Sequence, residues 1–209
     1  MSPDVDIRTI LTRRSTRNFS AKAVADDDLS TIIDAGLRAP SSKNSQPWYV
    51  AVARGEVKEQ ICLWVEENRE HIATKPGRLL IEEPDARTRD STFQTLRCVR
   101  AAPVLLLLFN RAPFTGGKKR VEDEIRSGKQ VNYENEYVGI GACMQNMLLA
   151  AHALGLGAVA VMDLLPAGPA ITSGFKIDYD LVIGIVVGHP RRNLPARTVD
   201  RERFVRYLD

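Results

Sequence analysis

An arginine-rich cluster near the start of the chain has the residue types of an anion-binding site. It consists of Arg13, Arg14, Ser15 and Arg17. In an extended segment, residues 13, 15 and 17 point to the same side. Two guanidinium groups and a hydroxyl could then hold a phosphate and a second electron-rich group. A solvated basic turn has the same composition, and the cluster alone leaves both interpretations open.

A polar loop at residues 40–48 could contact a heteroaromatic ligand. It contains Pro40, Ser41, Ser42 and Asn44, between a predicted helix and a predicted strand. Such a loop offers hydroxyls, amides and backbone N–H groups. Ser and Asn are also common in turns, where they bind the local backbone, so this second interpretation stays open too.

Motifs for a protein nucleophile or a metal are missing from the sequence. There is no P-loop, no Gly-x-Gly-x-x-Gly, no Gly-x-Ser-x-Gly and no Cys-x-x-Cys, and the three histidines lie far apart. We therefore expect no metal site and no catalytic side chain. A bound organic cofactor that brings its own reactivity fits better.

Size and composition are those of a globular protein. The chain has 209 residues, of which 44% are hydrophobic and 26% charged, with a net charge of +3. This mild excess argues against a nucleic-acid-binding domain. The longest apolar run, residues 104–109, is too short to span a membrane, and residues 1–17 have no signal-peptide core. Three widely spaced cysteines read as buried, reduced thiols, so we expect a cytoplasmic protein.

Hydrophobic periodicity predicts alternating helices and strands. Helices are expected at 7–11, at 26–37 with Asp26 as its cap, around 57–65 and at 135–154. Strands are expected at 49–53, 104–109, 158–162 and 181–187. The alternation by itself favours a parallel α/β sheet. We find no domain boundary, and predict one domain over residues 1–209.

Two charged stretches, residues 66–100 and 111–130, are expected to be largely exposed. Within them, residues 66–95 and 111–130 are candidate lid segments over a binding site. The helix at 135–154 differs from the others because it is apolar or small nearly all round. Such a helix must be buried on most sides, and a second subunit could supply part of that burial.

Taken in order, six segments of the chain resemble the FMN-dependent nitroreductase family. These segments are 13–17, 39–48, 102–109, 145–151, 155–157 and 185–190. The resemblance implies an α+β fold, with a mixed, mainly antiparallel sheet flanked by helices. It also implies an intertwined homodimer with FMN at the subunit interface. We prefer this sheet to the parallel one because the Rossmann fingerprint is missing.

The resemblance also implies roles for individual residues. Arg13 and Ser15 would hold the FMN phosphate, with Arg14 in the same cluster and Arg197 assisting. Arg17 would lie against the N1–C2=O edge of the flavin, where a cation favours the reduced form. Pro40, Ser41, Ser42 and Asn44 would come from the partner subunit. Gln94 and Arg97 would contact the pyrimidine edge, and the backbone around Val161, Met162 and Asp163 would face flavin N5.

The expected function is hydride transfer from NADH or NADPH through FMN to a small electron-poor acceptor, such as a nitroaromatic or a quinone, with ping-pong kinetics. Some segments are similar to the iodotyrosine deiodinase branch, which leaves a reductive dehalogenase or a dedicated dehydrogenase as alternatives. That branch uses a Glu and a Tyr four residues apart on its lid. This chain offers Glu66 with Glu70, or Glu67 with His71. A non-catalytic FMN-binding protein is a further alternative.

Overall fold

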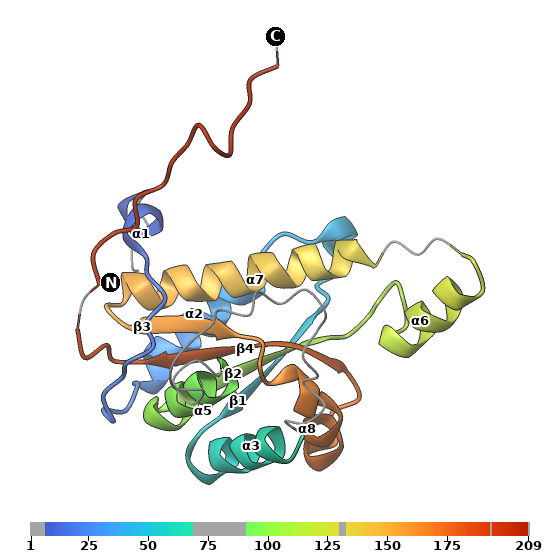
Figure 1. Ribbon diagram of the computed structural model, residues 1–209, viewed down its shortest axis with the longest axis horizontal. Helices are drawn as coiled ribbons and strands as arrows, with labels where there is room; N and C mark the ends of the chain where they lie inside the picture. Colours follow the sequence, from blue (N-terminus) through green and yellow to red (C-terminus); the bar gives the residue numbers. More distant parts are fainter. Residues whose placement is uncertain (1–6, 69–90, 130–132, 193, 209) are drawn as a thin grey trace, which may run out of the picture.

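The fold is built on one four-stranded sheet (Figure 1). The computed structural model describes residues 7–68, 91–129, 133–192 and 194–208. The strands are β1 (Trp48–Ala53), β2 (Val104–Asn110), β3 (Gly157–Val161) and β4 (Asp180–Gly188), in the spatial order β1-β2-β4-β3. All three strand pairings are antiparallel.

The parallel sheet favoured by the alternation of helices and strands is therefore wrong, whereas the antiparallel sheet implied by the family resemblance is confirmed. All seven residues of β2 are buried. An apolar run of this kind indicates that both faces of a strand are covered. It does not indicate the direction of the neighbouring strands, because helices cover both faces of this antiparallel sheet as well.

Helices form one layer on each side of the sheet (Figure 1). One face carries α2 (Asp26–Leu37) and α7 (Glu134–Ala153); the other carries α3 (Gly55–Glu67), α5 (Ser91–Ala101) and α8 (Gly168–Phe175). Successive side chains of a strand point to opposite faces. Leu105 and Leu107 accordingly pack in the α3–α5–α8 core, and Leu106 and Leu108 in the α2–α7 core.

The predicted helix at 135–154 is confirmed as α7, shifted by one residue. The sheet and α2 supply most of its burial, and α2 approaches closely at Gly36. A Cβ on Gly36 would lie 2.4 Å from Cε of Met147. Near the start of α7, however, Val138 stays 72% exposed. Part of the apolar surface of this helix is therefore open in the single chain.

The predicted cap of α2 is wrong. The N-cap is Ala25, and Asp26 is the first helical residue. Asp26 instead pairs with Arg54 at 2.7 Å. It remains favourable there, because a carboxylate in the first turn interacts well with the helix dipole. The short helix α1 (Ile7–Thr12) is present as expected, but Ile7 and Leu11 are exposed.

The two charged stretches contain more structure than their composition suggested. In the first, residues 91–101 form α5, with Thr92, Thr95, Leu96, Cys98 and Val99 buried. The expectation of a mostly exposed segment is wrong for this part, because helical spacing puts the apolar side chains on one face. The second contains α6 (Lys118–Arg126), which projects beyond the sheet (Figure 1).

The chain ends in an exposed arm, residues 194–208, that extends away from the sheet (Figure 1). A short helix, α8, and the 3₁₀ turn η3 (Leu165–Ala167) were not predicted. All three cysteines are buried and unpaired, as expected. Among the described residues, no helix is long and apolar enough to cross a membrane.

Candidate active site

The arginine-rich segment at 13–17 runs along the free edge of β3. Ser15 forms a parallel bridge with Ala158, and the Thr16 N–H donates to the Ala158 carbonyl at 3.1 Å. The two backbones are so close that a Cβ on Gly157 would lie 2.6 Å from Cγ2 of Thr16. Because the segment and β3 run in the same direction, Arg17 is carried towards the carboxyl end of β3.

A cavity of about 510 Å³ lies at that end of β3. Its lining comes from three parts of the chain: Arg17, then Ser91, Gln94, Thr95 and Cys98 of α5, then residues 160–163. The structure thus brings together five of the predicted site residues, namely Arg17, Gln94, Val161, Met162 and Asp163. Arg97 also lies on α5 but is exposed and does not line this cavity.

Two charged residues among those described line this cavity, and they differ in their hydrogen bonding. Asp163 accepts hydrogen bonds from the Ser91 hydroxyl at 2.9 Å and the Thr95 hydroxyl at 2.7 Å. Arg17 makes no hydrogen bond or ion pair within the part of the chain that the structure describes. Burial raises the pKa of Cys98 to about 11 despite the nearby charges of Arg17 and Arg97. The thiol is therefore protonated at neutral pH, and the charged groups among the described lining residues are the Arg17 cation and the Asp163 carboxylate.

At the other end of the segment, Arg13 has a buried nitrogen, Nη1, that no described residue satisfies. His152, in the last turn of α7, lies near this charge. Thr12 Oγ1 is 2.9 Å from His152 Nε2 and donates its own hydrogen to the Arg8 carbonyl. The imidazole must therefore donate through Nε2. Burial and the charge of Arg13 lower the pKa of His152. A buried, unpartnered guanidinium nitrogen beside a neutral imidazole would be satisfied by an anion.

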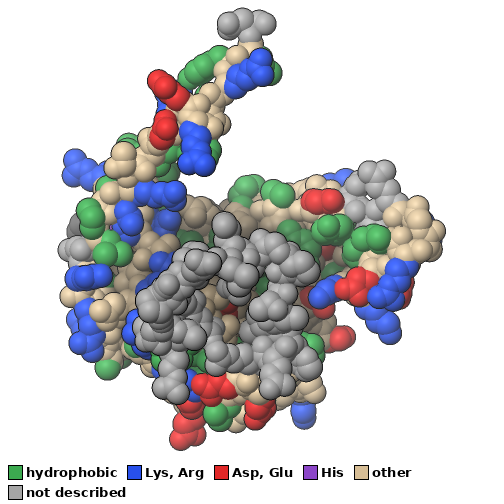
Figure 2. Space-filling view, in the orientation of Figure 1, with side chains coloured by type: hydrophobic (Ala, Val, Ile, Leu, Met, Phe, Trp, Pro, Cys, Tyr) green, Lys and Arg blue, Asp and Glu red, His purple; other side chains and the backbone are tan. Residues whose placement is uncertain are grey.

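Arg14 and Arg197 are placed differently from Arg13. The Arg14 side chain donates to the Pro195 carbonyl at 2.8 Å and lines a separate cavity of about 250 Å³ with Thr16, His152 and Arg192. Arg197 is exposed in the arm. Figure 2 shows Lys and Arg side chains gathered along the arm and the adjoining side of the molecule.

The loop residues Pro40, Ser41, Ser42 and Asn44 lie next to the start of α7. A Cβ on Gly139 would be 3.3 Å from Cβ of Ser41, and the Ser41 hydroxyl accepts the Gln46 N–H at 2.9 Å. His152, beside Arg13, follows Gly139 by 13 residues on the same helix, which is about 20 Å along the axis. Within one chain, these loop residues line neither the cavity at Arg17 nor the one at Arg14.

Sequence reasoning missed Ser91, Thr95 and Cys98. Ser91 and Thr95 are four residues apart and therefore share a helix face. That spacing was the available signal, but it was hidden in a stretch interpreted as exposed. The lid residues Glu70 and His71 lie outside the described residues. Among those that are described, no group of three or more His, Cys, Asp or Glu could hold a metal ion.

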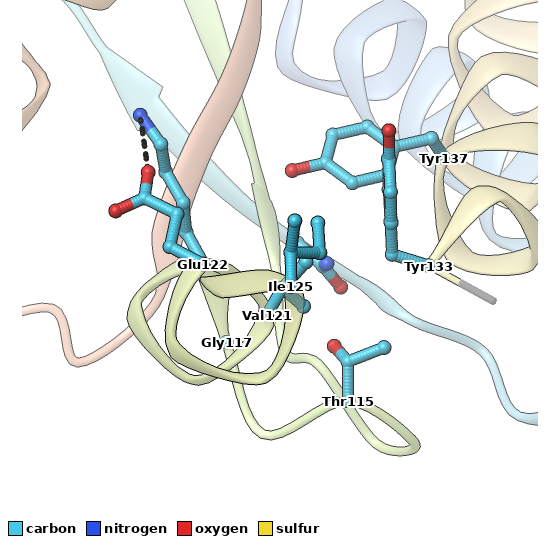
Figure 3. A pocket seen from close by; sticks show the side chains of 9 residues that line it. Thr115, Gly117, Val121, Glu122, Ile125, Tyr133 and Tyr137 are labelled. Atoms are coloured by element: carbon cyan, nitrogen blue, oxygen red, sulfur yellow. Dashed lines mark ion pairs between the residues drawn. The ribbon is translucent and has the colours of Figure 1, made fainter. Parts of the chain in front are cut away.

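A further cavity, of about 240 Å³, lies between α6 and the start of α7 (Figure 3). Val121 and Ile125 of α6 point towards Tyr137, whose ring meets that of Tyr133 edge-on with the centroids 6.1 Å apart. Beside it, the buried Glu136 accepts hydrogen bonds from Asn110 at the end of β2 and from Phe114 and Thr115 in the loop that leads to α6. This aromatic cavity was not expected from the sequence.

The chain as a whole is similar to several known proteins. The family model described as the nitroreductase family matches residues 10–189. An iodotyrosine deiodinase from Daphnia pulex is 28% identical over 186 residues, covering 86% of this chain and 57% of the deiodinase, so the chain spans little more than half of that relative. An NADPH-flavin oxidoreductase from Vibrio harveyi is 28% identical over 211 residues, covering 97% of this chain and 75% of the relative.

Among solved structures, the FMN-dependent nitroreductase NfnB from Mycobacterium smegmatis, determined in complex with NADPH, aligns with a TM-score of 0.71. The two are 18% identical, and the alignment covers 97% of both chains. This likeness confirms the α+β fold. The family match extends over most of the chain, from α1 to the end of β4. The chain belongs to the nitroreductase family.

Proposed function

We propose that the chain is an oxidoreductase that binds FMN and passes hydride from NADH or NADPH to a small electron-poor acceptor, of the nitroaromatic or quinone type. The observation that carries the proposal is the cavity at the end of β3. There Arg17, a cation with no ion-pair partner among the described residues, meets Gln94 and residues 160–163. We expect ping-pong kinetics, in which the nicotinamide leaves before the acceptor enters.

The residues present fit the cofactor at its phosphate end. The buried, unsatisfied Nη1 of Arg13 is the kind of group that a phosphate oxygen would satisfy. Ser15 lies two residues further on and is held against β3 by its bridge to Ala158. We assign the phosphate to Arg13 and Ser15. Arg14, which donates to the Pro195 carbonyl of the arm, and Arg197, two residues further along the arm, would assist. The neutral His152 adds no competing charge.

At the ring end, FMN when bound supplies the hydride-transferring atom, N5. The chain's own residues bind and orient the ring. Arg17 holds positive charge at the cavity, which stabilises the negative charge that gathers at the N1–C2=O edge on reduction. Gln94 would contact the pyrimidine edge, whereas Arg97, exposed on the same helix, does not line the cavity in the single chain. Val161, Met162 and Asp163, which line the cavity, would face N5.

The proposal includes a homodimer in which Pro40, Ser41, Ser42 and Asn44 contact the flavin bound to the partner. About 20 Å of α7 separates these residues from the region of Arg13 in one chain, so a second copy is needed to bring them there. The 72% exposed Val138 is a candidate for that interface. Light scattering after gel filtration should give twice the chain mass. Val138→Asp should shift the protein towards monomer and reduce FMN binding.

The names of two relatives bear on the hydride donor and on the acceptor. The Vibrio harveyi relative is an NADPH-flavin oxidoreductase, which supports the nicotinamide donor. The Daphnia pulex relative is a deiodinase, and this favours one second candidate, a reductive dehalogenase. The described lid residues Glu66 and Glu67 come without a tyrosine four positions later. A turnover screen of nitroaromatics, quinones and halogenated phenols distinguishes the two candidates. The single-domain organisation and the cytoplasmic location stay predictions.

The first experiment is the visible spectrum of the purified protein, followed by NADH and NADPH without oxygen. A yellow protein that bleaches with either donor supports the proposal. A yellow protein that does not bleach contradicts the hydride donor, and a colourless one that fails to bind added FMN contradicts the cofactor. Arg17→Ala should lower the midpoint potential of bound FMN by about 30 mV. This shift corresponds to about 1.4 kcal/mol for a two-electron couple, the strength of one charge-assisted hydrogen bond. The exposed Arg38→Ala is the matched control.

A further inference from the structure

Asp163 links the end of β3 to the start of α5 through both of its carboxylate oxygens. The Ser91 hydroxyl donates to Oδ1 at 2.9 Å, and the Thr95 hydroxyl donates to Oδ2 at 2.7 Å. Ser91 is the first residue of α5, and Thr95 lies one turn later on the same face. The carboxylate also lies where negative charge suits the helix dipole. The first turn of α5 is therefore tied to the strand at two points.

The opposite end of α5 is tied as well. The buried Lys58 of α3 donates from Nζ to the carbonyl of Val99 at 2.9 Å and also to the carbonyl of Ala102. A cation at the carboxyl end of a helix complements the dipole. With Asp163 at one end and Lys58 at the other, α5 has little freedom to slide along the sheet.

Gln94 lies between the two residues that Asp163 binds and lines the same cavity. We propose that Asp163 is a positioning residue: its carboxylate fixes the first turn of α5 and so holds Gln94 at the place where it contacts the flavin. This inference rests on the proposed FMN site. Asp163 also lines the cavity, but the role proposed here is a separate one, because Asp163 performs it through Gln94.

A double-mutant cycle on the FMN dissociation constant tests this coupling, measured by the quenching of flavin fluorescence. Asp163→Ala should weaken FMN binding about tenfold in the otherwise unchanged protein. In a Gln94→Ala background the same substitution should weaken binding less than threefold, because the residue that it positions is already gone. Side chains that act through one another give such non-additive effects. Additive effects, or no effect of Asp163→Ala on binding, would overturn the proposal.

Two further variants separate positioning from general loss of structure. Asp163→Asn keeps one acceptor oxygen, and its amide can donate to the other hydroxyl, so it should recover most of the binding. Thr95→Val removes one of the two hydroxyls without changing side-chain size, and serves where Asp163→Ala does not fold. It should weaken FMN binding in the same non-additive way. Asp34→Asn, exposed on α2, is the control for removing a carboxylate charge.

The outcome for the unsubstituted protein distinguishes the two proposals. If it binds no FMN, the proposed function fails, and the positioning role of Asp163 fails with it. If it binds FMN, and Asp163→Ala and Gln94→Ala act additively, only the positioning role of Asp163 fails.

Discussion

Replacing Glu136 tests whether a buried carboxylate holds the α6 region onto the sheet. Glu136 has no exposed surface. It accepts hydrogen bonds from the Asn110 side chain at 2.8 Å, from the backbone N–H groups of Phe114 and Thr115 at 2.9 and 3.1 Å, and from the Thr115 hydroxyl at 2.8 Å. These donors come from the end of β2 and the loop before α6. One side chain of α7 therefore binds both the end of β2 and the loop before α6.

The expected loss follows from leaving those donors unpaired. An amide, two backbone N–H groups and a hydroxyl lose their acceptor, and each buried polar group without a partner costs about 1–3 kcal/mol. We expect Glu136→Ala to reduce the free energy of unfolding by about 4 kcal/mol, which lowers the melting temperature by about 8–16 °C in a chain of this size. Glu136→Gln keeps one acceptor oxygen, so its loss should be about 2 kcal/mol.

The pH dependence gives an independent check. Burial acts to raise the pKa of Glu136, but the hydrogen bonds from Asn110, Phe114 and Thr115 outweigh it, and the pKa is lowered. A carboxylate with a lowered pKa contributes stability above its unfolded pKa, and that contribution is lost as the pH falls through the folded pKa. The difference between the unsubstituted protein and Glu136→Gln should therefore be largest near neutral pH and shrink below about pH 4.

Reversible urea unfolding at pH 7 and at several lower values measures both effects. Glu134→Gln, an exposed position one half-turn earlier on α7, is the matched control and should change the unfolding midpoint little. Equal midpoints for the unsubstituted protein and Glu136→Gln, or a difference that stays constant with pH, would refute the reasoning.

Three further predictions concern the segment beside β3 and the support of α5. Gly157→Ala places a methyl group 2.6 Å from Thr16 and should lower the free energy of unfolding by about 1–3 kcal/mol. The melting temperature should fall accordingly, and an unchanged melting temperature would contradict the close approach. Burial and the charge of Arg13 lower the pKa of His152, so the stability of the unsubstituted protein should decline as the pH falls below about 6.5, the ordinary value for His. His152→Gln should lack that decline. If the free energy of unfolding changes equally with pH from 7.5 to 5.5 in both proteins, the prediction is wrong. Lys58→Met leaves carbonyls at the end of α5 without their buried donor. It should lower the free energy of unfolding, measured with urea, by about 1–3 kcal/mol.

Periodicity in the sequence was enough to locate most of the scaffold. The strands at Trp48–Ala53 and Val104–Asn110 and the helix at Glu134–Ala153 lie within one or two residues of their predicted positions. The segments at Ser91–Ala101 and Gly168–Phe175 were not recognised as helices. In the first, charged residues on the exposed face masked the apolar positions of the buried face.

The candidate site was predictable only in part. Arg17 and Asp163 are far apart in the sequence, and only the order of several weak motifs indicated that they belong to one site. The four-residue spacing of Ser91 and Thr95 puts them on one helix face, but nothing in the sequence links that face to Asp163. Their role appears when their hydroxyls are seen on the two oxygens of Asp163.

The sequence by itself determined which segments are apolar on one face or on both, and that the chain carries an unusual set of arginines near its start. These properties depend on neighbours along the chain, so local spacing reveals them. The tertiary structure alone decided the strand directions, the alignment of residues 13–17 with β3, and the distance between Pro40–Asn44 and the region of Arg13. Each of these depends on contacts between residues far apart in the sequence, whose pairing no local pattern specifies.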